Sequence, residues 1–326
     1  MKKLLAIIMA VLPVMTWAQF APAAGQPGTT AMYADSSAFV AWATGCVIER
    51  GPMQIDNPSL GMANFGTEQD AIGVPGGTMS VVSLGDGGTA TLTFESPICN
   101  GEGPDFAVFE NGFANAQTPD YYFLELGFVE VSSDGENFFR FPAVSNVPTD
   151  TQLGGFACID PRQIHNFASK YEAMYGTPFD LDEIEDNPML DKNNITHVRV
   201  IDVIGNIDPE YATYDSEGHP VNDPWPTPFG SSGVDLDAVG VIHDVAHHQA
   251  VAENLAGQLE IYPNPVEDRL CVNVDDMQRI DLYNVTGQLV LSSTESEINV
   301  SGMESGVYFV RVNCGENIFT KRIIIR

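Results

Sequence analysis

The chain has 326 residues, enough for two domains, and carries 44 acidic side chains against 14 basic ones, for a formal net charge of −30. A surface this acidic repels nucleic acid and anionic membranes, so no nucleic-acid partner is expected, whereas it suits a secreted protein and divalent cations. The five cysteines include no CxxC pair, which argues against a zinc site. In an exported protein we expect one disulfide between Cys271 and Cys314, which lie on or just after predicted strands of the last domain.

Residues 1–18 have the pattern of an export signal. Two lysines precede the apolar run Leu4–Val14, and Thr16-Trp17-Ala18 offers the small residues that precede a cleavage site. This run is too short to span a bilayer, so no transmembrane segment is expected. The sequence therefore predicts a secreted chain that begins at Gln19.

Strand signals sharpen from residue 80 onward, where apolar and polar residues alternate and turn residues separate the runs. The turn sequences Gly85–Gly88 and Ser133–Asn137 predict hairpins. The expected strands are Thr89–Phe94, Tyr121–Ser132, Phe138–Phe141 and Ile195–Ile204.

Two further strands are expected to carry acidic residues. The apolar run Phe106–Phe109 is opened by Asp105 and closed by the turn Glu110-Asn111-Gly112, which predicts a strand covered on both faces. Near the end of the domain, Asp235 and Asp237 alternate with apolar neighbours, so both side chains are expected on one face of a closing strand. If the two strands are neighbours, at least three carboxylates approach one another.

One segment breaks the β pattern. From Pro161 to Tyr175 apolar residues recur at helical spacing, with Asp160 as the N-cap, so a helix is predicted there. Phe179–Ile184 is a candidate for a second, shorter helix. Residues 208–233 form a long Pro- and Gly-rich loop, and loops of this length are uncommon unless they have a function.

Together these elements predict a mainly β fold, a jelly-roll β-sandwich with a helical insertion, over residues 19–245. Over about residues 30–243 the chain resembles a largely uncharacterised family of bacterial cell-surface proteins, and more distantly galactose-binding-like and carbohydrate-binding jelly rolls. The stretches that carry this resemblance are SLGDGG, GPDFAVFENGF, FVEVSSDGENFFRFP, KYEAMYGTPFDL and SSGVDLDAVGVI.

After a linker at residues 246–258, a separate domain is expected at residues 259–326. Its motifs are YPNP, DLYNVTGQ, GVYFVRV and KRIIIR. This set resembles the type A sorting domain of the type IX secretion system of Bacteroidetes-like bacteria. The resemblance implies a small Ig-like β-sandwich, recognition by the type IX secretion machinery, and attachment to the cell surface at the outer membrane.

Acidic groups at strand ends predict a calcium site, because calcium binds six to eight carboxylate and carbonyl oxygens. The alternative is that these acids cap turns and accept backbone hydrogen bonds. In the resemblance to carbohydrate-binding jelly rolls, Asp237 matches by position an aspartate that binds structural calcium. The predicted calcium ligands are Asp105, Glu110, Asn111, Asp235 and Asp237.

Aromatic residues in loops predict a second site, since aromatic faces stack on sugar rings. Trp225, Phe229, Tyr121 and Tyr214 are the predicted ligand-binding residues, and the ligand is expected away from the calcium.

No catalytic residues are predicted. His243 and His247 have the spacing of a metalloprotease helix, but Asp244 stands where that motif needs Glu. The predicted function is therefore a non-catalytic surface protein that binds a glycan or another nutrient, such as a corrinoid. An extracellular polysaccharide hydrolase and a structural or adhesive surface protein are the alternatives.

Overall fold

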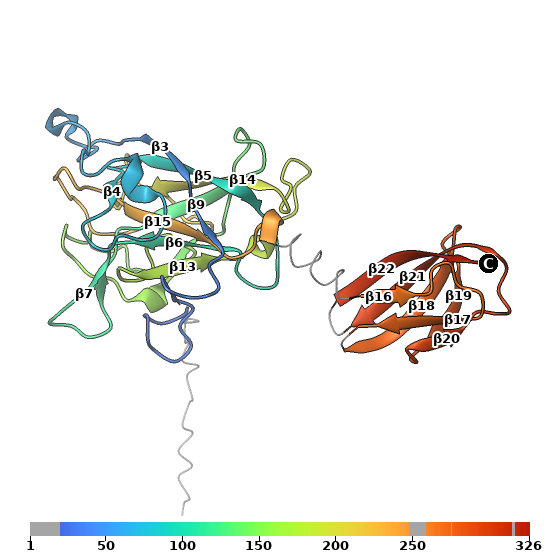
Figure 1. Cartoon of the computed structure of the whole chain (residues 1–326). Helices are drawn as coiled ribbons and strands as arrows, with labels where there is room; N and C mark the ends of the chain where they lie inside the picture. The colour runs from blue at the N-terminus through green and yellow to red at the C-terminus, as the bar shows by residue number, and fades with distance from the viewer. Residues whose placement is uncertain (1–19, 248–258, 275, 315–316) are drawn as a thin grey trace, which may run out of the picture. The chain divides into compact units, whose positions relative to one another are not determined.

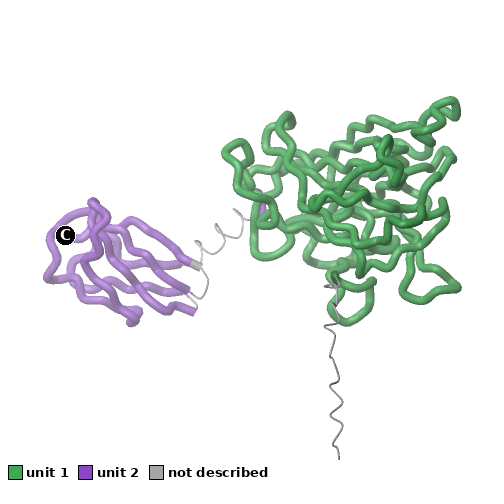
Figure 2. The backbone as a smooth tube through the Cα atoms, turned by 180° about the vertical axis from the view of Figure 1, so that it is seen from behind, with its two compact units in different colours: residues 1–245 green, residues 246–326 purple. Residues whose placement is uncertain are grey.

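The computed structural model describes residues 20–247, 259–274, 276–314 and 317–326. The predicted export signal and most of the predicted linker lie outside these residues. The chain divides into two compact units, residues 1–245 and 246–326 (Figure 2). Within the described residues, no helix has the length and apolar character needed to cross a membrane.

Unit 1 is built from two main antiparallel sheets (Figure 1). The first sheet contains, in order, β1 (Met32–Tyr33), β13 (Tyr175–Phe179), β6 (Phe106–Glu110), β15 (Asp235–Val241) and β2 (Ala41–Trp42), and β4 (Val82–Ser83) also pairs with β15. The second contains β10 (Phe139–Arg140), β9 (Gly127–Ser132), β14 (Ile195–Asp202), β5 (Thr89–Ile98) and β3 (Gly45–Glu49). Two small two-stranded sheets complete the unit: β7 (Phe113–Ala114) with β8 (Tyr122–Phe123), and β11 (Val144–Ser145) with β12 (Ile164–His165).

The core of unit 1 lies between these sheets. Val108 and Leu236 from the first sheet and Val131 and Val198 from the second are fully buried in one apolar cluster. The other face of β6 is also covered, since Phe109 packs in a second cluster. The predicted mainly β sandwich and the predicted strand with two covered faces are both confirmed.

Strand pairing brings the two acidic stretches together. β15 runs antiparallel to β6, with Leu236 opposite Glu110, so Asp235 lies beside Asn111 although 124 residues separate them. β15 also pairs with the early strand β2, which is the early-to-last pairing expected of a jelly roll.

The predicted helix at residues 161–175 is wrong. Asp160 does cap a helical turn, but this is a short 3₁₀ turn, η3 (Pro161–Gln163), and Ile164 then pairs with Ser145 in β12. Asn166 has a φ of 54°, which no right-handed helix contains. The apolar residues at helical spacing do reach the core, but tertiary pairing overrides the local propensity.

The remaining helical elements are also 3₁₀ turns. They are η1 (Pro58–Leu60), η2 (Glu68–Ala71) and η4 (Leu181–Glu183). η4 lies within the segment predicted as a short helix, although Phe179 itself ends β13.

Unit 2 has two antiparallel sheets around its own core. They consist of β16 (Glu260–Tyr262), β17 (Arg269–Asn273) and β20 (Glu297–Asn299), and of β19 (Leu289–Ser293), β18 (Met277–Asn284), β21 (Gly306–Cys314) and β22 (Asn317–Ile325).

The predicted disulfide between Cys271 and Cys314 is wrong, since all five cysteines are free thiols. Leu270 and Val272 enter the core from β17, so alternation turns Cys271 away from it. Cys314 on β21 points into that core. Cys271 therefore points away from the core on one sheet, whereas Cys314 points into the core from the other sheet.

Candidate ligand-binding site

A cavity of about 320 Å³ opens where β6 ends and β15 begins. We call it the aromatic pocket. Its rim is mostly aromatic and its floor is acidic, and its volume lies within the range of roughly 300–1,000 Å³ that is common for small-molecule sites. The lining residues are Thr78, Met79, Asn111, Phe113, Phe123, Glu125, Phe156, Thr227, Phe229, Ser231 and Asp235.

Asp235 and Asn111 form one side of the floor. The Nδ2 of Asn111 donates to Oδ2 of Asp235 at 2.9 Å, and the hydroxyl of Ser83 donates to Oδ1 of the same carboxylate. Each oxygen of Asp235 thus has one donor, which holds the side chain in place. Burial raises the pKa of Asp235 to about 6.

Glu125 forms the other side of the floor. Its neighbours Leu124 and Leu126 are fully buried in an apolar cluster, and Glu125 is only 4% exposed yet lines the pocket. Within the described part of the chain, no hydrogen bond to its carboxylate is recorded. Burial, followed by the nearby charges of Asp235 and Glu110, raises the pKa of Glu125 well above its ordinary value.

Glu110 adds a third carboxyl group next to this floor. It is 1% exposed; its Oε2 accepts from the backbone N–H of Gly112 at 2.7 Å, while Oε1 has no hydrogen-bond partner among the residues that the structure describes. Burial and the charge of Asp235 raise its pKa well above the ordinary value. The acidic floor therefore consists of Glu125 and Asp235, with Glu110 buried next to it, and an ionised form of the floor needs a positive charge.

The rim is a continuous row of phenylalanine rings. Phe113 stacks on Phe123 with ring centroids 4.9 Å apart, Phe123 lies 6.2 Å from Phe156, and Phe156 lies 5.8 Å from Phe229. Phe156 is 74% exposed and Phe229 is 47% exposed. Grouped exposed aromatics of this kind mark interaction sites more often than isolated ones do.

A second group of buried acids lies behind the floor and has a structural role. Asp86 accepts from the backbone N–H of Ile55 at 2.8 Å, Asp202 from Gly87 at 2.9 Å, and Asp223 accepts a backbone N–H in the same way. Burial raises the pKa of all three. These acids hold loops together, as the turn-capping alternative predicts.

The five predicted calcium ligands do not form one set. Asp105 lies at the opposite end of β6 from Glu110, which a strand rise of about 3.3 Å per residue makes roughly 16 Å. The two oxygens of Asp237 accept from the backbone N–H groups of Gly76 and Gly77 at 2.7 and 3.0 Å. Of the five predicted ligands, only Glu110, Asn111 and Asp235 lie next to one another.

Asp105 has a structural environment of its own. Its oxygens accept from the N–H groups of Gly101 at 2.7 Å and Leu181 at 2.8 Å, and Nδ1 of His243 lies 2.9 Å away. A β-bulge between Leu236 and Ala238 breaks the alternation on β15, which gives Asp237 partners different from those of Asp235. Across residues 20–247 and the described parts of unit 2, no group of three or more His, Cys, Asp or Glu side chains is placed to hold a metal ion.

The structure places the four predicted ligand-binding aromatic residues in different environments. Phe229 lines the pocket. Trp225 is only 9% exposed and donates its indole N–H to Asp86 at 3.0 Å, so the prediction that it faces a ligand is corrected to a core role. Tyr121 and Tyr214 are exposed but do not line this pocket.

Sequence reasoning missed Phe113, Phe156 and Glu125. A signal existed for Glu125, because a charged residue between two leucines in a strand-like run has to be buried or face a cavity. Nothing in the sequence separates the two phenylalanines from core residues.

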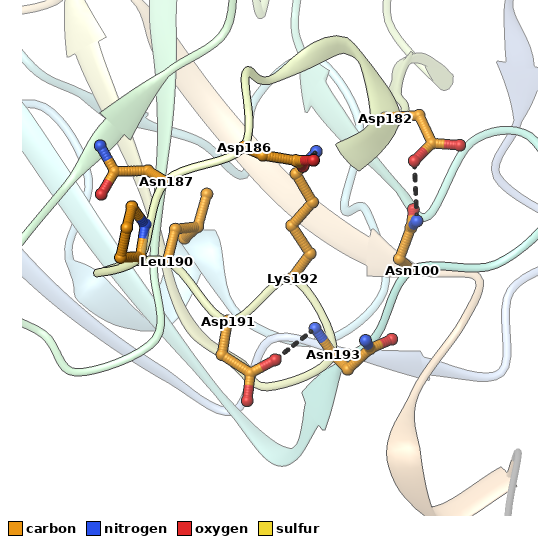
Figure 3. Close-up of a pocket in the computed structure, with 9 residues that line it drawn as sticks. Asn100, Asp182, Asp186, Asn187, Leu190, Asp191, Lys192 and Asn193 are labelled. Carbon is orange, nitrogen blue, oxygen red and sulfur yellow. Dashed lines mark hydrogen bonds and ion pairs between the residues drawn. The ribbon is translucent and has the colours of Figure 1, made fainter.

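A larger cavity of about 570 Å³ lies over residues 182–193 (Figure 3). Here Lys192 bonds the carbonyl of Ile184 at 2.6 Å and the carboxylate of Asp186 at 2.9 Å. Asn100 donates to Asp182 at 2.8 Å (Figure 3). This cavity therefore contains its own cation, unlike the aromatic pocket.

Fold and site together describe a two-unit β protein with an aromatic-rimmed cavity in unit 1. Residues 260–326 match the family described as secretion system C-terminal sorting domain. The chain thus carries a type IX sorting domain, which confirms the resemblance of its last motifs and indicates export with attachment to the cell surface.

No curated protein matches the chain. Among solved structures, a biofilm associated protein, BSP domain, is similar at 10% identity over 73% of this chain and 48% of that chain, with a TM-score of 0.23. The chain thus spans about half the length of that structure's chain, and the likeness is too low to bear on fold or function.

Proposed function

We propose that unit 1 is a ligand-binding domain, displayed outside the outer membrane, that binds a small extracellular molecule in the aromatic pocket without turning it over. The observation that carries this proposal is a row of four phenylalanine rings, three of them exposed, over the buried carboxyl group of Glu125, to which no described residue donates a hydrogen bond. Both features are unfavourable in the free protein, since a buried carboxyl group without a partner loses its hydrogen bonds to water and exposed rings remain in contact with water. A ligand that covers the rings and pairs with the carboxylate removes both penalties.

The sequence predicts a glycan or another nutrient, such as a corrinoid, as the ligand, and the aromatic rim suits a sugar unit. Aromatic faces stack on sugar rings, and carboxylates accept hydrogen bonds from hydroxyl groups. The volume of about 320 Å³ is at the low end for small-molecule sites, so a single sugar unit fits better than a corrinoid.

Substitution of the rim is expected to weaken binding. After a glycan screen of the mature chain, calorimetry should show that Phe229→Ala lowers the affinity about three- to tenfold, because one ring contact is lost. Tyr214→Ala is the matched control, since Tyr214 is 46% exposed, close to the 47% of Phe229, but lies outside the pocket. Equal losses in both variants would place the ligand elsewhere, and a screen without any hit would favour an adhesive or structural role.

A hydrolase is the second candidate, because the floor contains two carboxyl groups whose pKa values are raised. Glycoside hydrolysis needs one protonated carboxyl group as the acid and a second carboxylate, and the pKa of Glu125 and that of Asp235 both lie above their ordinary values. Turnover of a bound oligosaccharide, lost in Glu125→Gln while binding persists, would establish this activity and reject the non-catalytic proposal.

A further inference from the structure

We infer that the ligand of the aromatic pocket carries a positive charge, as a protonated amine held by Glu125 and Asp235 beneath the phenylalanine rim. This inference rests on the proposed function and narrows its ligand class. It follows from the charge balance of the pocket, from the unpartnered carboxylate and from the rim.

The acidic floor has no cation of its own. The six basic side chains described in unit 1 are all engaged elsewhere. Arg50 bonds the carbonyls of Phe65, Ser83 and Gly66; Arg140 and Arg199 bond Glu130; Arg162 bonds Asp160; Lys170 bonds the carbonyls of Pro161 and Ile164; and Lys192 bonds Asp186. Arg50 is linked to the floor through Ser83, whose hydroxyl donates to Asp235. The guanidinium of Arg50, however, bonds the backbone carbonyl of Ser83 and not the carboxylate of Asp235. Without a cation the floor acids stay protonated, and their ionised form needs a counter-charge from outside the chain.

The free hydrogen-bonding capacity of the floor points to a donor-rich cation. Asp235 already accepts from Ser83 and Asn111, whereas Glu125 lines the pocket and accepts from no described residue. An ammonium group supplies up to three N–H donors together with the counter-charge that an ionised floor needs, and charge-assisted hydrogen bonds are the strong ones. A neutral sugar supplies hydroxyl donors but no counter-charge, so it leaves the floor acids protonated.

The rim favours the same class of ligand. A cation within about 6 Å of a ring centroid is attracted by the negative face of the ring. Four such rings surround the opening, and the remaining apolar side chain there is Met79. Calcium instead needs six to eight oxygen ligands, which phenylalanine and methionine cannot supply.

The test compares matched pairs of probes on the complete mature chain by calorimetry at pH 7. The pairs are 2-phenylethylammonium with 2-phenylethanol, and glucosamine with N-acetylglucosamine. We expect the charged member to bind at least about tenfold more tightly. Binding should also release protons from the floor, which is detected as a heat that varies with the ionisation enthalpy of the buffer.

The pH dependence involves every charged group that faces Glu125. These are Asp235, Glu110, Asp223 and Asp202, all acidic, so affinity for the amine should fall as the pH is lowered from 7 to 5. Glu125→Gln keeps the shape but removes the charge, and should abolish the preference for the charged probe. Glu102→Gln, the same change at an exposed residue outside the pocket, should leave it intact.

Three outcomes would overturn the inference. Equal affinity for both members of each pair, or binding of N-acetylglucosamine alone, would reject a cationic ligand and leave the proposed function standing. Binding of calcium chloride that is lost in Glu125→Gln would assign the floor to a metal. Absence of binding by every probe and by the glycan screen would reject the proposed function as well.

Discussion

Deletion of residues 259–326 is expected to leave a folded unit 1 in the periplasm and to abolish its display at the cell surface. The tail matches a sorting domain, so its loss removes the signal that the secretion machinery recognises. Unit 1 should fold without it, because the two units have separate apolar cores. Protease treatment of intact cells, followed by immunoblotting, measures the exposed fraction.

Two controls make this result specific. Full-length Phe229→Ala, altered only in the pocket rim, should be displayed as well as the wild type. The truncated protein, purified from the periplasm, should melt cooperatively. Truncated protein at the cell surface would show that the tail is not needed for export.

A rise in pH from 5 to 8 is expected to lower the stability of unit 1. Its buried carboxyl groups have folded-state pKa values above the unfolded ones, so the folded state binds more protons. Their contribution is complete below the unfolded pKa and is lost as the pH rises through the folded pKa. For Asp235, with a pKa raised from 3.8 to about 6, this loss is on the order of 3 kcal/mol at full ionisation. Glu110, Glu125 and Asp202 act in the same direction.

Urea unfolding at four pH values measures this effect. Asp235→Asn should be close to wild type below the unfolded pKa of 3.8 and more stable than wild type at pH 8, because the variant has no charge to bury. Added salt at 0.5 M serves as the control, since it screens surface repulsion and leaves buried groups almost unaffected. Stability that increases with pH would contradict the burial of these acids as carboxyl groups with raised pKa values.

Several features of the protein follow from the sequence by itself. The motifs of residues 260–326 specify the sorting domain, and the apolar run Phe106–Phe109 between turn residues specifies a strand with both faces covered. Alternation also predicts the long strands of the second sheet and the mainly β class. These features depend on local periodicity and turn chemistry, which short stretches of chain contain in full.

Other features depend on which distant segments meet, and only the tertiary structure decides them. Ile164 pairs with Ser145 in a strand where the sequence predicts a helix. Trp225, predicted to face a ligand, is buried and donates its indole N–H to Asp86. The sequence predicts a calcium site with Asp235 and a separate ligand site with Phe229, yet both residues line one pocket. The register of β15 against β6 joins residues 124 positions apart. Such a register is set by packing across the whole unit, which local sequence patterns do not contain.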